Sequence, residues 1–156
     1  MRRRRRGTLG AQSPITSGAR SVAGMARTPQ QTLGERGETE AAQWLTDRGL
    51  VLLARNIRRG RDEADLVFKE PNGNLLIIVE VKTRASARAW PEARVDAAKA
   101  IALRRLAHTA LIEIPQCSGV RIDVLSVNLP QNGEAAFHWF KDAIAVPLSW
   151  LQSRGR

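Results

Sequence analysis

The apolar positions along the chain alternate between helix-like and strand-like spacing. A 3.6-residue repeat predicts one helix early in the chain and another in its second half, and short β-prone runs predict five strands. The predicted elements are a helix at 33–48, strands at 50–57, 66–68 and 75–79, a helix at 97–111, and strands at 119–127 and 135–140. The order α-β-β-β-α-β-β predicts an α/β fold with a mixed central β-sheet flanked by helices.

The second and third strands are expected to form a hairpin. Asn72-Gly73 lies between them and is typical of a two-residue type I′ turn, because both residues tolerate a positive φ. In that register Asp65 lies directly opposite Glu80, and Glu63 lies opposite Lys82. Directly opposed residues point to the same face of a sheet. The hairpin therefore gathers three acids and one lysine on one surface.

Such a cluster has two interpretations. Like charges at this separation repel one another, and a divalent cation removes the conflict. Hard carboxylate oxygens suit Mg²⁺ or Mn²⁺, which also bind substrate phosphates. The alternative is a strand end that reaches solvent, where Glu80 and Lys82 form an ordinary ion pair of little net value. With Asp65 opposite this pair, both interpretations stay open.

An Asp, a hairpin and then Glu-x-Lys resemble the PD-(D/E)xK pattern of the restriction-endonuclease-like superfamily. More closely, the chain resembles the YraN family of uncharacterised bacterial proteins, which is similar to archaeal Holliday-junction resolvases. The residues that carry the resemblance are Arg55-Asn56, Glu63-Ala64-Asp65-Leu66-Val67 and Val79-Glu80-Val81-Lys82-Thr83-Arg84. It covers residues 33–144 and implies a restriction-endonuclease-like core. Two positions depart from the family pattern: Asp62 replaces a Gly and adds an acid, and Ala64 replaces an Ile.

The resemblance implies a metal-dependent nuclease (a hydrolase) that cleaves phosphodiester bonds in DNA, with branched or recombination-type DNA as the natural substrate and DNA repair or recombination as the setting. Asp65 and Glu80 would hold Mg²⁺ or Mn²⁺, and the Val81 carbonyl would add a ligand. Lys82 would orient or deprotonate the attacking water. Glu38 would complete a second metal site or position water.

Glu38 has a second explanation, because an acid in an early helical turn ordinarily interacts with the positive end of the helix dipole. The resembled family, however, has a first-helix glutamate after a glycine, which Gly37-Glu38 matches. Glu63 is expected to support the acidic cluster. Asp123, in the Arg-x-Asp-Val element at 121–124, is expected to be structural or supporting.

Basic residues surround the acidic hairpin. They either balance nearby carboxylates in solvated loops or contact phosphates, and their position next to the proposed centre favours the second interpretation. Arg104 and Arg105 are expected to be plain surface. The candidates for nucleic-acid contact are Arg55, Arg58, Arg59, Arg61, Arg84 and, by resemblance, Lys99.

The first 31 residues differ in composition from the rest. They contain seven arginines and no acid, so they supply most of the formal net charge of +10, and residues 32–156 keep 18 basic against 15 acidic groups. Such a segment cannot bury enough apolar surface to order itself. We expect a disordered basic tail at 1–31, a domain at 32–145 and a C-terminal extension at 146–156. The tail imitates an organellar transit peptide, but a solvated arm or a true start at Met25 is preferred.

Composition narrows the classes of protein and of site that the chain could represent. A single cysteine, Cys117, excludes an intramolecular disulfide framework and suits a reducing compartment, and two histidines offer no zinc spacing. No run is long and apolar enough to span a membrane, and we expect a cytoplasmic protein. The resemblance implies that its partner is nucleic acid, namely DNA. Resolvase-like enzymes act as dimers, which allows a homodimer. The alternatives are a catalytically silent nucleic-acid-binding module with the same fold, or a protein–protein adaptor.

Overall fold

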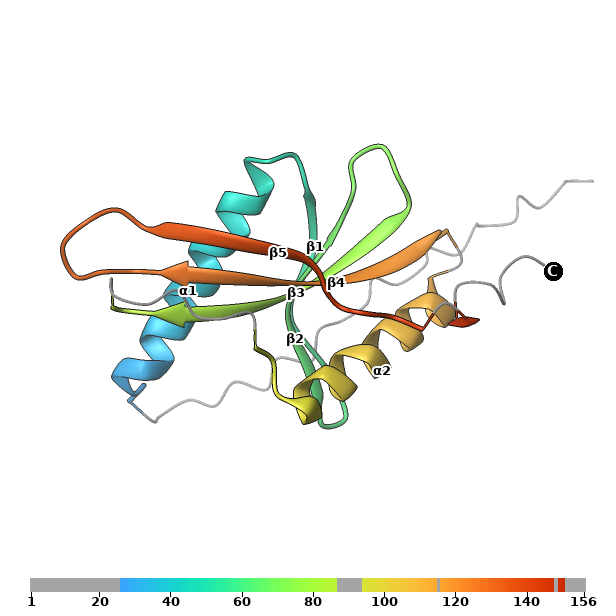
Figure 1. Ribbon diagram of the computed structural model, residues 1–156, viewed down its shortest axis with the longest axis horizontal. Coiled ribbons are helices and arrows are strands. Elements are labelled where there is room, and N and C mark those ends of the chain that lie inside the picture. The colour runs from blue at the N-terminus through green and yellow to red at the C-terminus, as the bar shows by residue number, and fades with distance from the viewer. Residues whose placement is uncertain (1–25, 87–93, 115, 148, 151–156) are drawn as a thin grey trace, which may run out of the picture.

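The computed structural model describes residues 26–86, 94–114, 116–147 and 149–150. Along the chain the order is helix, three strands, helix and two strands, so the predicted order α-β-β-β-α-β-β is confirmed (Figure 1). The elements are α1 (Pro29–Thr46), β1 (Val51–Arg59), β2 (Asp62–Lys69), β3 (Leu75–Arg84), α2 (Ala97–Glu113), β4 (Gly119–Asn128) and β5 (Ala136–Ile144). Residues 1–25 of the expected tail and 151–156 of the expected extension lie outside the described residues.

The five strands form one sheet in the order β1-β2-β3-β4-β5. The pair β3–β4 is parallel and the other three pairs are antiparallel, which confirms a mixed sheet. Parallel neighbours need a crossover connection, and α2 lies in the segment that joins β3 to β4. Among the described helices, none is long and apolar enough to cross a membrane.

The two helices cover opposite faces of the sheet (Figure 1). On one face, α1 contributes Ala41, Ala42 and Leu45 to a core that includes Phe68 and Val79. On the other face, α2 contributes its own cluster, which includes Leu103, Leu106, Ala107 and Leu111. The central strand β3 is therefore buried on both sides, which explains its unbroken apolar run from 75 to 79.

The first helix begins four residues earlier than its apolar pattern predicts. Thr28 forms a capping box with Gln31: its hydroxyl accepts from the Gln31 N–H at 3.2 Å, and its own N–H donates to the Gln31 side chain at 2.9 Å. Pro29 occupies the first helical position, where its missing N–H costs nothing. Residues 29–31, which were expected in the tail, therefore belong to α1.

The hairpin turn differs from the predicted type I′ turn, although its register is the expected one. The β2–β3 ladder pairs Lys69 with Leu76 and Leu66 with Val79. The loop spans 71–74, with a hydrogen bond of 3.2 Å from the Glu70 N–H to the Leu75 carbonyl, and neither residue 72 nor residue 73 has a positive φ. Pro71 explains the difference, since it lacks the N–H that a paired position needs and favours the second position of an ordinary turn. The predicted loop at 72–73 and the observed loop at 71–74 are both centred on the peptide bond between residues 72 and 73, so they give the same register.

The end of the described chain packs on α2. Ile144, Val146 and Trp150 all contact the α2 cluster, and the Trp150 ring lies 4.7 Å from the His108 ring. The described part of the expected C-terminal extension therefore adds to the second core.

Candidate active site

A pocket of about 320 Å³ opens where β2, β3, α1 and the first turns of α2 meet. It contains the acids predicted from the hairpin and from the first helix. The residues that line it are Gln30, Leu33, Gly34, Glu38, Glu63, Asp65, Glu80, Val81, Thr83 and Lys99. Four of the predicted site acids thus share one pocket, together with one lysine from α2.

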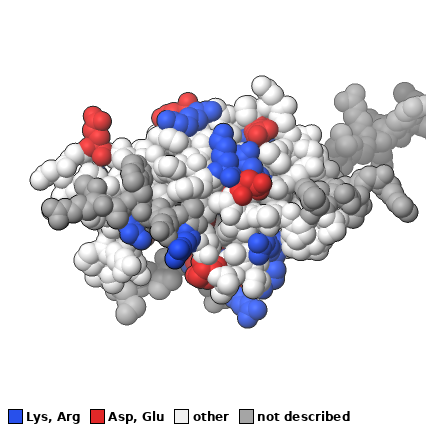
Figure 2. All heavy atoms as spheres, in the orientation of Figure 1, with Lys and Arg blue, Asp and Glu red and all other residues white. Residues whose placement is uncertain are grey.

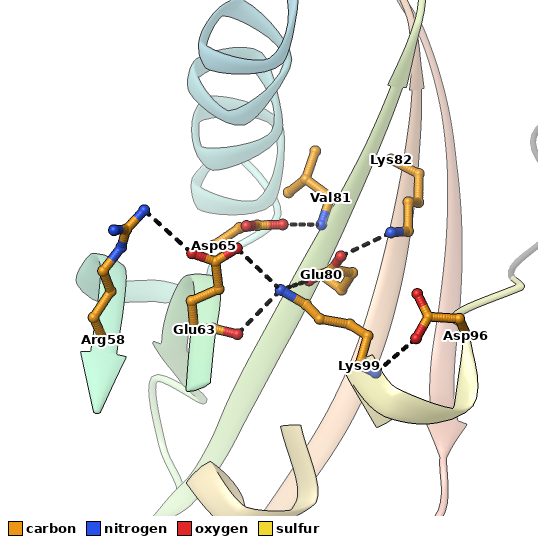
Figure 3. Close-up of polar contacts among 8 residues, drawn as sticks. All are labelled: Arg58, Glu63, Asp65, Glu80, Val81, Lys82, Asp96 and Lys99. Atoms are coloured by element: carbon orange, nitrogen blue, oxygen red, sulfur yellow. Dashed lines mark hydrogen bonds and ion pairs between the residues drawn. The ribbon is translucent and has the colours of Figure 1, made fainter. Parts of the chain in front are cut away.

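The sheet loses its regular pairing at this pocket. The β2–β3 ladder ends at Leu66–Val79, and beyond it the Val81 N–H donates to Asp65 Oδ2 at 2.7 Å (Figure 3). Leu66 packs on the α1 side of the sheet, whereas Ala64 packs on the α2 side, so strict alternation breaks between them. The predicted opposition of Asp65 to Glu80 is therefore replaced by a side-chain contact across the strand ends.

Glu80 is the most buried acid of the pocket, with 4% of its surface exposed. Its Oε1 accepts a hydrogen bond of 2.8 Å from Lys82 Nζ. Its Oε2 forms an ion pair with Lys99 Nζ at 3.0 Å. One buried carboxylate is thus flanked by two ammonium groups (Figure 3).

Asp65 carries the largest perturbation. Burial raises the pKa of this carboxyl to about 7, and the negative charge of Glu80 adds to the effect. The Val81 N–H and the Lys99 charge act in the opposite direction, and Glu38 adds a smaller increase. Near neutral pH the pocket therefore holds more negative charge than its surroundings easily stabilise.

Glu38 reaches the pocket because α1 crosses β3 very closely at the preceding residue. A Cβ atom placed on Gly37 would overlap the Thr83 side chain, so only glycine permits this approach. Burial raises the pKa of Glu38, while a side-chain hydrogen bond with Asn56 lowers it. The pair Gly37-Glu38 thus combines a packing requirement with a carboxylate in the pocket.

Asn56 is a neighbour of the site that the sequence analysis did not assign. It lies within β1 with a φ of 50°, a left-handed conformation that asparagine tolerates better than most residues. Its position opposite the irregular part of β2 lets its side chain meet Glu38. The only signal in the sequence was its place in the Arg55-Asn56 element.

Lys99 lies deeper in the site than a lysine on a surface helix would. Its side chain is 17% exposed, and its Nζ also donates to the Glu63 main-chain carbonyl at 3.1 Å. Burial alone would lower the pKa of Lys99, but the charges of Glu80, Asp65 and Glu63 outweigh it and raise that pKa above its ordinary value. Asp96 caps α2 by accepting from the Lys99 N–H at 2.8 Å, which fixes where the lysine leaves the helix.

Arg105 was expected to be plain surface, and this expectation is wrong. Its guanidinium forms two hydrogen bonds with the Asp62 carboxylate, one of them 2.7 Å from Nε to Oδ2. Asp62 is only 9% exposed. The additional acid next to the site is therefore neutralised by α2 and ties the start of β2 to that helix.

The basic residues around the hairpin fall into two groups. Arg58 pairs with Glu63 at 3.2 Å and Arg59 pairs with Glu113 at 2.6 Å, so their charges are partly balanced. Arg55, Arg61 and Arg84 are exposed. On the face seen in Figure 2, basic and acidic side chains are interspersed, and the described residues there form no continuous basic surface.

Asp123 is fully buried in a separate network. Its carboxylate accepts two hydrogen bonds from Arg121, at 2.8 and 2.9 Å, one from Trp139 Nε1 at 2.9 Å and one from the Asp142 N–H at 2.8 Å. These contacts join β4 to β5, which supports the structural alternative for this residue. They leave it no evident part in the pocket.

The oxygen atoms of the pocket suit a hard divalent cation. Glu80 Oε2 is buried with only the Lys99 ammonium beside it, and Asp65 and Glu38 lie in the same pocket with raised pKa values. As the side chains stand, no three acids, histidines or cysteines in the described ranges converge closely enough to hold a metal ion. Binding would require Asp65 to turn from the Val81 N–H or Lys99 to leave Glu80.

Comparison with known proteins places the chain in a family. The model of the uncharacterised protein family UPF0102 matches residues 37–127. A UPF0102 protein of Nocardioides is 39% identical over 68% of this chain and 86% of its own length. Another, from Streptomyces coelicolor, is 44% identical over 65% of this chain and 79% of its own length.

Among solved structures, a Pyrococcus furiosus SfsA structure in complex with Ca²⁺ has a TM-score of 0.38 and 15% identity. That match covers 76% of this chain, which spans 65% of that protein. The matched family segment runs from Gly37 to Val127 and contains all four acids of the pocket, Lys82 and Lys99. The chain belongs to the UPF0102 family, which is the YraN family that its sequence resembles.

Proposed function

We propose that this protein is a divalent-metal-dependent nuclease that hydrolyses phosphodiester bonds in DNA, with branched DNA as the preferred class. The observation that carries the proposal is the gathering of Glu80, Asp65 and Glu38 in one pocket, where Glu80 is buried and the pKa of Asp65 is raised to about 7. Buried carboxylates that lie close together are costly unless enough positive charge lies beside them. Mg²⁺ or Mn²⁺ supplies that charge and lowers the pKa of a bound water.

Each side chain then has a distinct task. Asp65 and Glu80 hold the cation, the Val81 carbonyl adds a ligand, and Glu38 completes the shell or positions water. Lys82, held 2.8 Å from Glu80 Oε1, orients the attacking water and offsets charge on the phosphate. Glu63 supports the cluster, and the exposed arginines near the pocket contact the DNA backbone.

The test is cleavage of linear, forked and four-way DNA by the full chain with Mn²⁺, Mg²⁺, Ca²⁺ or chelator. Cleavage is expected with Mn²⁺ and Mg²⁺, little with Ca²⁺ because its looser geometry positions water poorly, and none with chelator. Glu80→Gln should lower the rate by about a hundredfold or more. Glu134→Gln is the matched control, since it removes the charge of an exposed acid in the loop between β4 and β5. Cleavage that is independent of metal and survives Glu80→Gln would refute the proposal.

A catalytically silent nucleic-acid-binding module is the second candidate. It is favoured by the two lysines that already flank Glu80 and by the absence of three converging metal-binding side chains in the described residues. Calorimetric titration with Mn²⁺ separates the two, because a silent module has no need of the ion. Metal binding that is lost in Glu80→Gln supports the nuclease, and DNA binding without metal binding supports the silent module.

A further inference from the structure

Lys99 is the least explained charge of the pocket. Its Nζ lies 3.0 Å from Glu80 Oε2, 3.1 Å from the Glu63 main-chain carbonyl and 3.9 Å from the Glu63 carboxylate. A main-chain carbonyl and two carboxylates form the kind of oxygen environment that binds a hard cation. In Figure 3 the ammonium group lies between the β2 and β3 acids and approaches them from α2.

We infer that Lys99 is an internal counter-ion of the acidic pocket, and that a divalent cation and the Lys99 ammonium compete for Glu80. The inference rests on the proposed metal site and adds how that site is loaded. Two positive groups cannot both lie about 3 Å from one buried carboxylate oxygen without strong repulsion. Loading the metal therefore requires Lys99 to leave.

The structure offers Lys99 a place to go. A second cavity of about 540 Å³ lies next to the pocket, between the start of β2 and the first turns of α2. Glu63 and Lys99 line both cavities, so they form the wall between them. The four-carbon stem of a lysine can swing its ammonium from one side of such a wall to the other while its backbone stays capped by Asp96.

Lys82 provides the contrast within the same site. It also contacts Glu80, but through Oε1, with 34% of its side chain exposed, and it does not line the pocket. Removing either lysine strengthens cation binding by a general electrostatic effect. Removing Lys99 should add a second gain, since its ammonium lies between the oxygens of Glu80 and Glu63, whereas Lys82 contacts Glu80 alone.

The first experiment is calorimetric titration of Mn²⁺ into the full chain and its Lys99→Met, Lys82→Met, Lys99→Arg and Lys141→Met variants. Lys99→Met should bind about tenfold more tightly than the wild type, Lys82→Met only slightly more tightly, and the other two no more tightly than the wild type. Equal gains for Lys99→Met and Lys82→Met would overturn the inference and leave the metal site standing. Failure of every folded variant to bind Mn²⁺ would overturn both the inference and the proposed function.

The second experiment uses the unmodified chain, so it does not depend on a variant that folds. Lysine acetylation by a small acylating reagent is quantified by mass spectrometry with Ca²⁺ and with chelator. Lys99 should react several-fold faster with Ca²⁺, because its ammonium then leaves the acids, whereas Lys69 and Lys141 should not change. A Lys99 reactivity that Ca²⁺ leaves unchanged, under conditions where calorimetry shows Ca²⁺ bound, would overturn the inference.

Discussion

At the scale of single residues, the pocket holds carboxylates whose negative charges repel one another. The nearby ammonium groups offset only part of this repulsion. Asp65 shows this conflict, since its hydrogen bond from Val81 does not cancel the effects of burial and of Glu80. Glu80 shows how the ammonium groups relieve it, since Oε1 is bonded to Lys82 and Oε2 lies 3.0 Å from the Lys99 ammonium. Buried carboxylates with perturbed pKa values are common at binding and catalytic sites.

The charge on Asp65 should make the metal-free protein less stable as the pH rises. Its folded-state pKa of about 7 exceeds the ordinary value of 3.8, so the folded protein binds this proton more tightly than the unfolded chain does. The free energy of unfolding therefore falls between about pH 4 and pH 7 and stays low above that. Asp65→Asn removes the charge but keeps an oxygen for the Val81 N–H, and it should stabilise the fold by about 2 kcal/mol at pH 8.

Chemical denaturation in chelator, at pH 5 and at pH 8, measures this effect in the wild type and the variant. The gain from Asp65→Asn should be several-fold smaller at pH 5, where the wild-type carboxyl is mostly protonated in the folded state. A gain that is the same at both pH values would show that packing, not ionisation, separates the two proteins.

At the scale of secondary-structure elements, the sequence predicted the order of helices and strands better than their local detail. The β2–β3 register follows from apolar alternation and a turn centred on 72–73, and it holds although the turn type does not. The break in alternation between Ala64 and Leu66 lies opposite Asn56 of β1, whose φ of 50° is left-handed. Hydrophobic periodicity contains no information about such a tertiary irregularity.

The candidate site, like the fold, could be predicted from the sequence only in part. The acids of the hairpin were identifiable from their chemistry and spacing, and Glu38 through resemblance, because a helix predicted to start at residue 33 made it an ordinary early-turn acid. In the structure α1 begins at Pro29, so Glu38 lies in the middle of the helix and not at its dipole end. Arg105 was misjudged since its partner Asp62 lies 43 positions away in the chain. Partners of this kind become visible only when the helix is placed on the sheet.

The crossing of α1 over β3 gives a prediction with a matched control. Gly37→Ala should lower the free energy of unfolding by about 2 kcal/mol, because the new methyl overlaps Thr83 and the helix must move. Gly34→Ala lies one turn earlier on the same helix, with nothing within 4 Å of the new Cβ, and should raise it by about 0.5–1 kcal/mol.

Denaturant unfolding of both variants and of the double variant Gly37→Ala/Thr83→Gly tests the contact itself. Thr83→Gly removes the overlapping side chain. The double variant should therefore lose less free energy of unfolding than the losses of the two single variants added together. Purely additive effects would show that Gly37 is needed for a reason other than the approach to Thr83. Since Glu38 follows Gly37, Gly37→Ala should also weaken Mn²⁺ binding in calorimetry.

At the scale of the whole molecule, net charge says little about a nucleic-acid surface. The first 31 residues contribute seven arginines, whereas residues 32–156 are nearly balanced. On the face in Figure 2, positive and negative side chains alternate. That face has no broad basic surface, so we propose that the folded part contacts the DNA backbone through the arginines near the pocket.

These arginines should not contribute equally. Arg61 and Arg84 are exposed, and Arg61 lines the second cavity, whereas Arg58 and Arg59 lie 3.2 and 2.6 Å from acids. An arginine that contacts a phosphate displaces cations condensed on the DNA. An arginine that is already paired with an acid of the protein contributes less to this release. Single alanine variants of Arg61 and Arg84 should each reduce the slope of log affinity against log salt by about one unit, and those of Arg58 and Arg59 by clearly less.

Fluorescence anisotropy of labelled four-way DNA with Ca²⁺, at several salt concentrations, gives the slopes. Equal reductions at all four positions would mean that DNA displaces the acids from Arg58 and Arg59, and no reduction at any position would place the DNA elsewhere on the molecule.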